Sequence, residues 1–417
     1  MRKKNLHMKK ITHDRASDSD RSCEQGAAAL VGHSIRFEPL PPRHELTELR
    51  SKVRAFLAEQ EAGGAYRAGA EGWAGYDPAF TRAVARQGWI GMTWPKRYGG
   101  HERSAIERLV VTEELLAASA PVRAHWVADR QSGPLLLKFG TEGQRQRYLP
   151  RIAAGECFFC IGMSEADSGS DLASIRTRAR QVDGGWRVNG AKLWTSNAHR
   201  VHMMILFART GEGGESRREG VSQFLVDLST PGISVRPIRN LAGEADFNEV
   251  VFDDVFIPDD MLVGEVGNGW KQVTSELVYE RSGPDRWLSS YFLLRLLADH
   301  TARCGEGAAA ARQGVGRLAA HLYTLRQMAG SIAGMVEAGY LPNTEAALVK
   351  DLGTTFEREI PEVVRMVVPE SERYGPGAVP ELAKSLDHLA LHAPSFTIRG
   401  GTREILRGII AKSLGMR

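Results

Sequence analysis

The hydrophobic periodicity of this 417-residue chain changes twice along its length, and these changes constrain the fold more than any single motif does. Up to residue 156 the apolar residues recur at helical spacing, as in Glu45–Glu61. From residue 157 to residue 266, short apolar runs are separated by turn signals such as Asp183-Gly184-Gly185, a pattern that predicts strands. From Gly267 onward the helical period returns, with breaks at Gly and Pro. We therefore expect an α+β multidomain protein whose elements follow the order α, β, α.

The two changes of period divide the chain into four predicted segments. Residues 1–40 are expected to be a disordered N-terminal extension, because Met1–Ser22 holds seven Lys or Arg and three Asp but lacks the apolar stretch of a secretory signal. We expect a helical domain over residues 41–156, a β domain over residues 157–266 and a second helical domain over residues 267–417.

Beyond its first 22 residues the chain carries 47 basic and 47 acidic side chains, so its body is neutral. A neutral body does not predict binding to nucleic acid or to an anionic membrane. No apolar run approaches the length of about 18 residues that a transmembrane helix needs. Four cysteines are too few for a disulfide scaffold, and the run around Cys157 and Cys160 is typical of a buried strand. We expect reduced cysteines and a cytoplasmic location.

Two segments of the predicted β domain carry side chains suited to a polar or aromatic ligand. Gly162–Asp171 follows a predicted strand and collects Ser, Gly and Asp residues, whose hydroxyls and free backbone N–H groups suit a polar ring edge or a phosphate. In Lys192–Asn197, Trp194 precedes two hydroxyl residues and could cover an aromatic cofactor. A surface turn and an ordinary strand end with a core Trp are the alternative interpretations.

Two segments of the second helical region are candidates for chemistry. Glu280 falls on the apolar face of its predicted helix, where a carboxylate is unfavourable unless it is paired or used. The alternative is a structural pair of Glu280 with Arg281. Gly400–Glu404 opens the last predicted helix, with Thr402 as its N-cap and two glycines that permit a close backbone approach to a ligand. Here the alternative is an ordinary capped helix.

Two further patterns are interpreted as structural. Gly314–Ala319 matches G-x-G-x-x-A, but no predicted strand precedes it, so it lacks the strand–turn–helix context of a dinucleotide site. His388 and His392 lie four residues apart without a neighbouring Glu motif, so we interpret them as a solvated helix face rather than as zinc ligands. We therefore expect no metal site.

Taken together and in this order, the motifs resemble those of the acyl-CoA dehydrogenase family of flavoproteins. The resemblance runs from about Glu45 to Arg417 and rests on the segments GWIGMTWPKRYGG, MSEADSGSD, KLWTSN, FDDVFIP, VGEVGNGW, YER and IRGGTREILR. It implies an N-terminal α-helical domain, a central β-barrel domain and a C-terminal four-helix bundle.

The resemblance also implies FAD as cofactor and the α,β-dehydrogenation of an acyl-CoA thioester to the trans-2-enoyl-CoA. In this family a carboxylate removes the α-proton, and the β-hydride passes to flavin N5. The positions that match the family's cofactor-binding residues are Ile161, Met163, Ser164, Gly169, Ser170, Trp194, Thr195, Ser196, Thr402 and Glu404. The positions that match its substrate-binding residues are Ser170, Arg281 and Gly400.

The resemblance places the catalytic base at Glu280. Most members of the family carry a Glu directly before the final Gly-Thr pair, but this chain has Gly400 there, and a glycine cannot abstract a proton. Other members place the Glu immediately before the helix Arg, which here is Arg281. The Glu absent at residue 400 is therefore matched by one at residue 280. The N–H of Gly400 would help to polarise the thioester carbonyl.

A last departure from the family pattern concerns assembly. The R-x-x-F-G and Q-x-x-G-G-x-G motifs, with which homotetrameric members reach the FAD of a neighbouring subunit, are absent from this sequence. The chain in this respect resembles the α chain of α2β2 dehydrogenases of actinobacteria, which implies a related partner chain; a homo-oligomer is the alternative. An electron-transferring flavoprotein is the implied electron acceptor.

Two other functions compete with the dehydrogenase. One is an oxidase or monooxygenase reaction on the same fold, and the other is a non-catalytic flavoprotein.

Overall fold

The computed structural model describes residues 35–39, 44–69, 72–212, 214, 216–304, 308–376 and 378–416, without the side chains of Trp73, Val278 and Tyr279. Most of the predicted N-terminal extension, with Cys23, lies outside the described residues. Among the described residues no helix is both long enough and apolar enough to cross a membrane.

The first part of the chain is helical. Its helices are α2 (His44–Ala62), α3 (Pro78–Arg86), α4 (Ala105–Ala117), α5 (Arg123–Val127), α6 (Gly133–Phe139) and α7 (Glu142–Ala153). Local sequence explains where several of them begin: the Ser104 side chain caps α4 in a reciprocal pair with Glu107, and Thr141 caps α7 with Gln144 in the same way. Helices α5 and α6 were not predicted from the sequence, because helices of 5 and 7 residues are too short to show a clear period.

The middle of the chain forms one mixed sheet of eight strands. These are β1 (Phe159–Gly162), β2 (Arg178–Val182), β3 (Gly185–Ser196), β4 (Met203–Arg209), β5 (Val221–Asp227), β6 (Ile233–Ile238), β7 (Phe247–Pro258) and β8 (Leu262–Val263). Their order is β6-β7-β3-β2-β4-β5-β8, and β1 pairs with β4 in parallel. All but the last residue of β4 and of β5 are buried, so this antiparallel pair lies in the core. Cys157 and Cys160 are buried and unpaired near β1, and burial raises the pKa of the Cys157 thiol to about 11.

The last part of the chain is helical again, which confirms the predicted α+β fold class. Its helices are α8 (Gly269–Ser282), α9 (Tyr291–Arg303), α10 (Ala309–Glu337), α11 (Asn343–Val367), α12 (Glu370–Tyr374), α13 (Pro380–Phe396) and α14 (Arg403–Ser413). The helical stretch expected over residues 268–303 is two helices, because Gly283 and Pro284 end α8 and a short 3-10 turn follows. Gly314 lies within α10, so its G-x-G pattern is helical and not a nucleotide loop.

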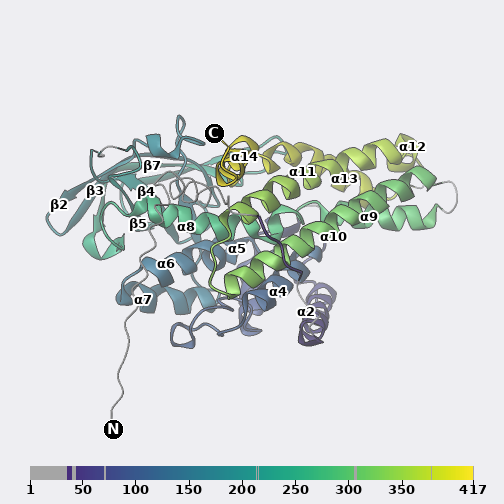
Figure 1. The fold of residues 1–417 in the computed structure, drawn as a ribbon, viewed down its shortest axis with the longest axis horizontal. Helices are drawn as coiled ribbons and strands as arrows, with labels where there is room; N and C mark the ends of the chain where they lie inside the picture. The colour runs from purple at the N-terminus through teal and green to yellow at the C-terminus, as the bar shows by residue number, and fades with distance from the viewer. Residues whose placement is uncertain are drawn as a thin grey trace, which may run out of the picture.

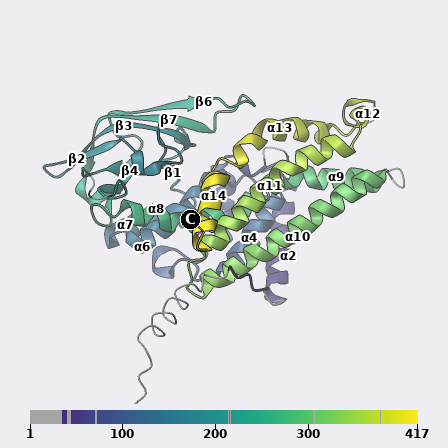
Figure 2. The same ribbon diagram turned by 45° about the horizontal axis from the view of Figure 1, so that its top comes forward.

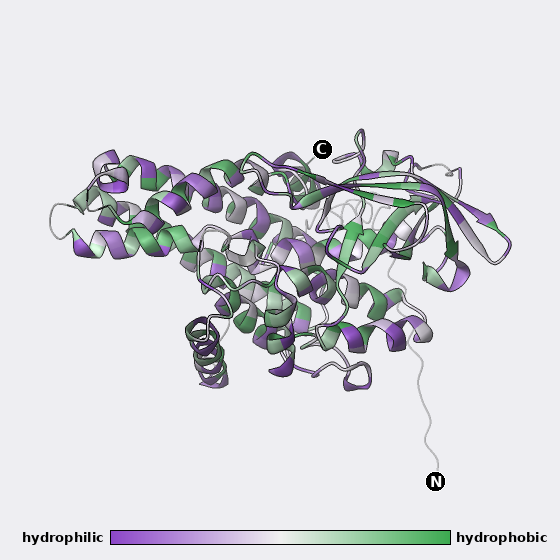
Figure 3. Cartoon of the chain, turned by 180° about the vertical axis from the view of Figure 1, so that it is seen from behind, coloured by the Kyte–Doolittle hydropathy of each residue, from purple (hydrophilic) through white to green (hydrophobic). Residues whose placement is uncertain are grey.

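The sheet and the long helices lie side by side, with the N-terminal helices below both (Figure 1). In Figures 1 and 2, α14 lies at the end of the C-terminal helices that is next to the sheet. Figure 3 shows that the central strands are mostly hydrophobic, whereas the long helices alternate between hydrophobic and hydrophilic positions. The junction between sheet and helices therefore brings segments that are distant in the sequence together.

Candidate active site

A buried ion pair ties the two predicted ligand segments of the sheet together. Lys192 is fully buried, and its Nζ lies 2.8 Å from Glu165 Oε1 and 3.0 Å from the carbonyl oxygen of Met163. The backbone N–H of Leu193 donates to the carbonyl of Ser164 at 2.8 Å. Burial lowers the pKa of Lys192 to about 8, although the charge of Glu165 opposes the shift. This pair, which was not predicted from the sequence, fixes the loop after β1 against β3.

Trp194 is presented outward by an irregularity in β3. The pairing of β3 with β7 shifts register between Lys192 and Thr195, and Trp194 has a φ of 61°, which is unfavourable for a bulky residue. Its side chain is 55% exposed and contacts Phe247 edge to face, with ring centroids 6.1 Å apart. Backbone strain of this kind occurs at ligand sites, and an exposed indole offers a flat surface for an aromatic ring.

Eight of the ten predicted flavin residues lie at the end of β1, on the loop that follows it or at the end of β3, and the Leu193–Ser164 hydrogen bond joins these segments next to Trp194. Ile161, Met163 and Ser164 are half-buried at the end of β1, whereas Gly169 and Ser170 are exposed further along the loop. Ser196 is half-buried at the end of β3. The Thr195 hydroxyl is buried and has no hydrogen-bond partner among the described residues. A hydroxyl in that condition needs a polar ligand atom or water.

Glu280 lies in the last turn of α8, beside Gly400. A Cβ atom placed on Gly400 would lie 3.0 Å from Glu280 Oε1 and 3.0 Å from Arg286 Nη2. Arg286 Nη2 lies 2.6 Å from the same carboxylate oxygen, and Arg286 Nε donates to the Glu280 carbonyl at 3.1 Å. The Arg286 side chain is buried, so it holds the carboxylate of Glu280 in one orientation.

The Gly400–Thr402 turn is held in place by a buried lysine. Gly400 and Gly401 have φ values of 70° and 97°, a conformation that favours glycine. Lys350 Nζ donates to the carbonyl of Gly401 at 2.7 Å, and burial beside Arg286 lowers the pKa of Lys350 to about 7. Arg281 also reaches this turn, since its Nη2 would lie 3.7 Å from a Cβ on Gly401.

Thr402 and Glu404 begin α14 on the far side of the turn. Thr402 has the extended backbone of an N-cap, and its hydroxyl accepts from the N–H of Ile405 at 3.5 Å. Glu404 is exposed, and hydrogen bonds from its own backbone and from Thr402 lower its pKa. Glu280, Arg281 and Gly400 thus form one cluster, and the residues of the sheet that were predicted to bind flavin form another.

A small apolar core joins the two clusters. It consists of Ile175, Phe207, Val221 and Val273, with Met163, Leu172, Trp270 and Leu277 packed against it. Val273, Trp270 and Leu277 belong to α8, and Met163 belongs to the loop after β1. Packing therefore fixes the helix that carries Glu280 against the loop that carries Ser164.

Buried charges surround the Glu280 cluster, and most of them were not predicted from the sequence. Asp285 pairs with Arg130 at 2.7 Å and with Arg286 at 3.5 Å, and Arg399 pairs with Glu357 at 3.0 Å. Although burial alone would raise the pKa of Asp285, the two arginines lower it to about 2. The charged Pro284-Asp285-Arg286 run inside an apolar helical region was the signal that could have identified this network.

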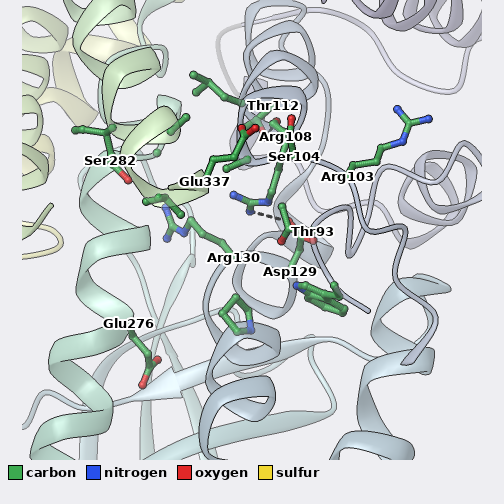
Figure 4. Close-up of a pocket in the computed structure, with 18 of the residues that line it drawn as sticks. Thr93, Arg103, Ser104, Arg108, Thr112, Asp129, Arg130, Glu276, Ser282 and Glu337 are labelled. Carbon is green, nitrogen blue, oxygen red and sulfur yellow. Dashed lines mark hydrogen bonds and ion pairs between the residues drawn. The ribbon is translucent and has the colours of Figure 1, made fainter. Parts of the chain in front are cut away.

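A cavity of about 540 Å³ opens beside α8 and is lined by residues of α4, α6 and α10. Figure 4 shows Arg108 and Asp129 pointing toward one another in it, joined by an ion pair of 2.8 Å. Glu276, one helical turn before Glu280, lies on α8 and points toward the strand beneath, where Gln223 Nε2 donates to it at 2.8 Å. Burial raises the pKa of Glu276 to about 8, and the charge of Glu280 adds to the rise.

Two family models match the chain. The model "Acyl-CoA dehydrogenase, N-terminal domain" matches residues 43–156, and "Acyl-CoA dehydrogenase, middle domain" matches residues 160–255. Among curated proteins, acyl-CoA dehydrogenase FadE26 of Mycobacterium tuberculosis is 31% identical over 396 residues, which are 90% of this chain and 97% of that protein. FadE34 of the same organism is 34% identical over 336 residues, or 80% of this chain, but this chain spans only 45% of the length of FadE34.

Solved structures show the same fold over nearly all of the chain. A structure titled "Tcur3481-Tcur3483 steroid ACAD" has a TM-score of 0.80 and 30% identity, covering 91% of this chain and 100% of that one. The ChsE4-ChsE5 complex from Mycobacterium tuberculosis has a TM-score of 0.77 and 27% identity, covering 91% of this chain and 99% of that one.

Proposed function

Because the chain belongs to the acyl-CoA dehydrogenase family, whose cofactor is FAD, we propose that it dehydrogenates an acyl-CoA thioester to the trans-2-enoyl-CoA with Glu280 as the base. The observation that carries this proposal is the position of the Glu280 carboxylate, which lies 3.0 Å from where a side chain at Gly400 would begin. A carboxylate at this position takes the place of the Glu that most family members carry where this chain has Gly400.

The residues of the sheet fit a flavin. The exposed Trp194 indole offers a flat face for the isoalloxazine ring. The Thr195 hydroxyl is buried without a hydrogen-bond partner among the described residues, and a polar atom at the edge of the flavin would supply that partner. Ser164, on the loop after β1, and Ser196, at the end of β3, lie close by and would hold the ring's polar edge. FAD, when bound there, supplies the acceptor for the β-hydride.

The chain's own residues supply binding and proton transfer. Glu280 takes the α-proton of the thioester, and Arg286 holds that carboxylate in position. The N–H of Gly400 would donate to the thioester carbonyl oxygen and so stabilise the enolate charge that develops as the proton leaves. The buried Arg281 side chain would line the passage of the CoA moiety, and Ser170 would contact its pantetheine.

We further propose that the acyl group is bulky. The cavity of about 540 Å³ next to α8 is within the usual range for drug-sized ligands, and its lining mixes apolar side chains with polar ones such as Arg108, Asp129 and Glu276. The similar structure titled a steroid dehydrogenase supports a polycyclic acyl group as one candidate.

A related second chain is the proposed partner, with an electron-transferring flavoprotein as the acceptor. The missing R-x-x-F-G and Q-x-x-G-G-x-G motifs support this, and so does the two-chain complex among the similar structures. Large apolar side chains are also exposed on the C-terminal helices, as expected of a surface covered in an assembly. They are Tyr323, Met366, Leu391 and Ile405, and Ile398 is exposed in the turn between α13 and α14.

The experiment that tests this function compares the chain alone with the chain co-expressed with a related neighbour. Each preparation is scored for bound FAD and for bleaching of the flavin absorbance by a panel of acyl-CoA thioesters. We expect bleaching by the co-expressed pair and little by the lone chain. Full bleaching by the lone chain would refute the partner, and a flavin that no acyl-CoA bleaches would refute the dehydrogenase.

A further inference from the structure

We propose that Glu244, His388 and His392 form a binding site for a divalent transition-metal ion such as Zn²⁺. His388 and His392 lie one turn apart on α13, and Glu244 comes from the loop between β6 and β7. His388 Nδ1 lies 3.5 Å from Glu244 Oε1, and His392 Nε2 lies 3.0 Å from Glu244 Oε2. Two imidazoles and one carboxylate are a common zinc ligand set, and the fourth position is left for water or another ligand.

The distances between the ligand atoms suit a tetrahedral ion. Zinc–nitrogen and zinc–oxygen bonds of about 2.0–2.1 Å require ligand atoms about 3.3 Å apart in a tetrahedral site. The two nitrogen–oxygen distances in this group, 3.0 Å and 3.5 Å, lie on either side of that value. All candidate ligand atoms lie within 4.8 Å of one another, so small side-chain shifts complete the site.

The alignment of the atoms favours a shared ion over a hydrogen bond. His392 Nε2 is buried and close to Glu244 Oε2, but it makes no hydrogen bond of acceptable geometry among the described residues. Close but misaligned atoms are expected of two ligands that point at a common third atom. The two imidazole rings also stack, with centroids 4.3 Å apart, so both rings lie on the same side of α13 beside Glu244.

The loop that carries Glu244 is already ordered. The N–H of Glu244 donates to Asn240 Oδ1 at 2.9 Å, and the N–H of Asn240 donates to the Glu244 carbonyl at 2.8 Å. Glu244 is 32% exposed, and the two histidines are 16–17% exposed, so the site is sheltered but open to an ion from solvent. A preformed site loses little conformational entropy when an ion binds.

A metal ion here would connect the two sides of the active site. Near Glu244, the Asp246 carbonyl accepts from the N–H of Asn197 at 2.8 Å, and Phe247 contacts Trp194. On the other side, α13 leads directly into the turn at Gly400. Figure 2 shows the loop after β6 extending toward α13. The ion's role is therefore structural: it fastens the edge of the sheet to the helix that precedes the Gly400 turn.

A second group of metal-binding side chains must be separated from this one in any test. His300, Cys304 and Glu372 lie together at the ends of α9 and α12, with Cys304 Sγ 3.5 Å from His300 Nε2. Cys304 and Glu372 are both exposed. A test in a Cys304→Ser background removes the thiol and isolates the Glu244 group.

The test treats the purified full chain with a chelator, incubates it with Zn²⁺ and measures bound zinc per chain after gel filtration. In the Cys304→Ser background we expect about one Zn²⁺ per chain and a Tm raised by zinc. Adding His388→Ala and His392→Ala should abolish both effects, and Glu244→Gln, which keeps the side-chain shape, should weaken binding at least tenfold. His321→Ala, which alters an exposed histidine paired with Glu359, is the matched control and should change neither.

The proposal is overturned if the Cys304→Ser chain binds no zinc, or if its zinc survives the loss of His388 and His392. Should the double variant fail to fold, judged by its circular dichroism, Glu244→Gln alone decides: unchanged zinc affinity contradicts the site. Because bound zinc and Tm are measured without substrate, failure here leaves the proposed dehydrogenase reaction intact.

Discussion

The Glu280 carboxylate occupies the space into which a side chain at residue 400 would grow, since a Cβ on Gly400 would stand 3.0 Å from Glu280 Oε1. The two residues are 120 positions apart in the sequence, and both face Arg286. A carboxylate carried by α8 and one carried by the Gly400 turn would therefore lie at the same position in the site. The absence of a side chain at Gly400 is what makes room for Glu280 and Arg286.

Adding a side chain at Gly400 should be harmful on two grounds. Gly400→Ala would strain a backbone with a φ of 70°, at a cost of about 1–2 kcal/mol, and would also displace Glu280 or Arg286. We expect lower stability in denaturant titration and slower flavin bleaching. Gly408→Ala is the control, because Gly408 lies inside α14 with open space around it and should be neutral or slightly stabilising. Equal effects of the two substitutions would contradict the crowding at Gly400.

The buried carboxyl of Glu276 should make stability depend on pH. Its pKa is raised to about 8 by burial, so the folded chain keeps a proton that the unfolded chain loses above pH 4.5. Stability should therefore fall as the pH rises from about 4.5 to about 8, by a few kcal/mol in all. Glu276→Gln keeps an acceptor for Gln223 and should flatten this part of the curve. Parallel pH profiles of wild type and variant would show that Glu276 does not hold the proton.

Asp285 should be one of the least replaceable charged residues in the chain. Asp285→Asn leaves Arg130 and Arg286 buried without their shared carboxylate, and breaking a buried pair in this way costs about 3–5 kcal/mol. Because the pKa of Asp285 is lowered to about 2, its contribution is complete above pH 4 and is lost as the pH falls through 2.

The comparison for Asp285→Asn is Glu212→Gln, since Glu212 pairs with Arg178 on the surface, where both side chains are mostly exposed. That change should shift the free energy of unfolding by less than about 1 kcal/mol. If urea titrations gave both variants similar losses, the buried charge network would not stabilise the fold.

Replacing Trp194 should separate stability from cofactor binding. Trp194→Gly removes a bulky side chain from a backbone with a φ of 61°, where glycine is unstrained, so the apoprotein should be as stable as wild type or slightly more so. The same change removes the proposed face for the isoalloxazine ring, so the FAD content after purification should fall. A variant that retains FAD fully would exclude Trp194 from the flavin site.

The order of helices and strands was predictable because it depends on the local spacing of apolar residues, which can be read directly from the sequence. The helix over His44–Ala62 and the strand over Met203–Arg209 follow from the spacing of apolar residues alone. The motif segments around Ser164 and Trp194 were also visible, since each is continuous in the chain. Their mutual position was not, because the Lys192–Glu165 pair that joins them spans 27 residues.

The site's long-range partners could not be predicted for the same reason. Lys350 supports the Gly401 carbonyl from 51 residues away, and nothing in its local sequence marks it as buried. His388 and His392 were interpreted as a solvated face because no Glu lies near them in the sequence. Glu244 reaches them from another part of the fold. Only the folded chain shows which charged residues share a site.

The most direct test of the account is the rate of flavin bleaching by acyl-CoA in Glu280→Gln, measured in the FAD-loaded, co-expressed complex. A glutamine keeps the shape of the side chain but cannot accept the α-proton, so we expect unchanged FAD content and a bleaching rate reduced by about 10²–10⁴-fold. Lys271→Gln, which changes an exposed side chain on the same helix, should retain bleaching and controls for disturbance of α8. Bleaching of Glu280→Gln at the wild-type rate would contradict the assignment of Glu280 as the base.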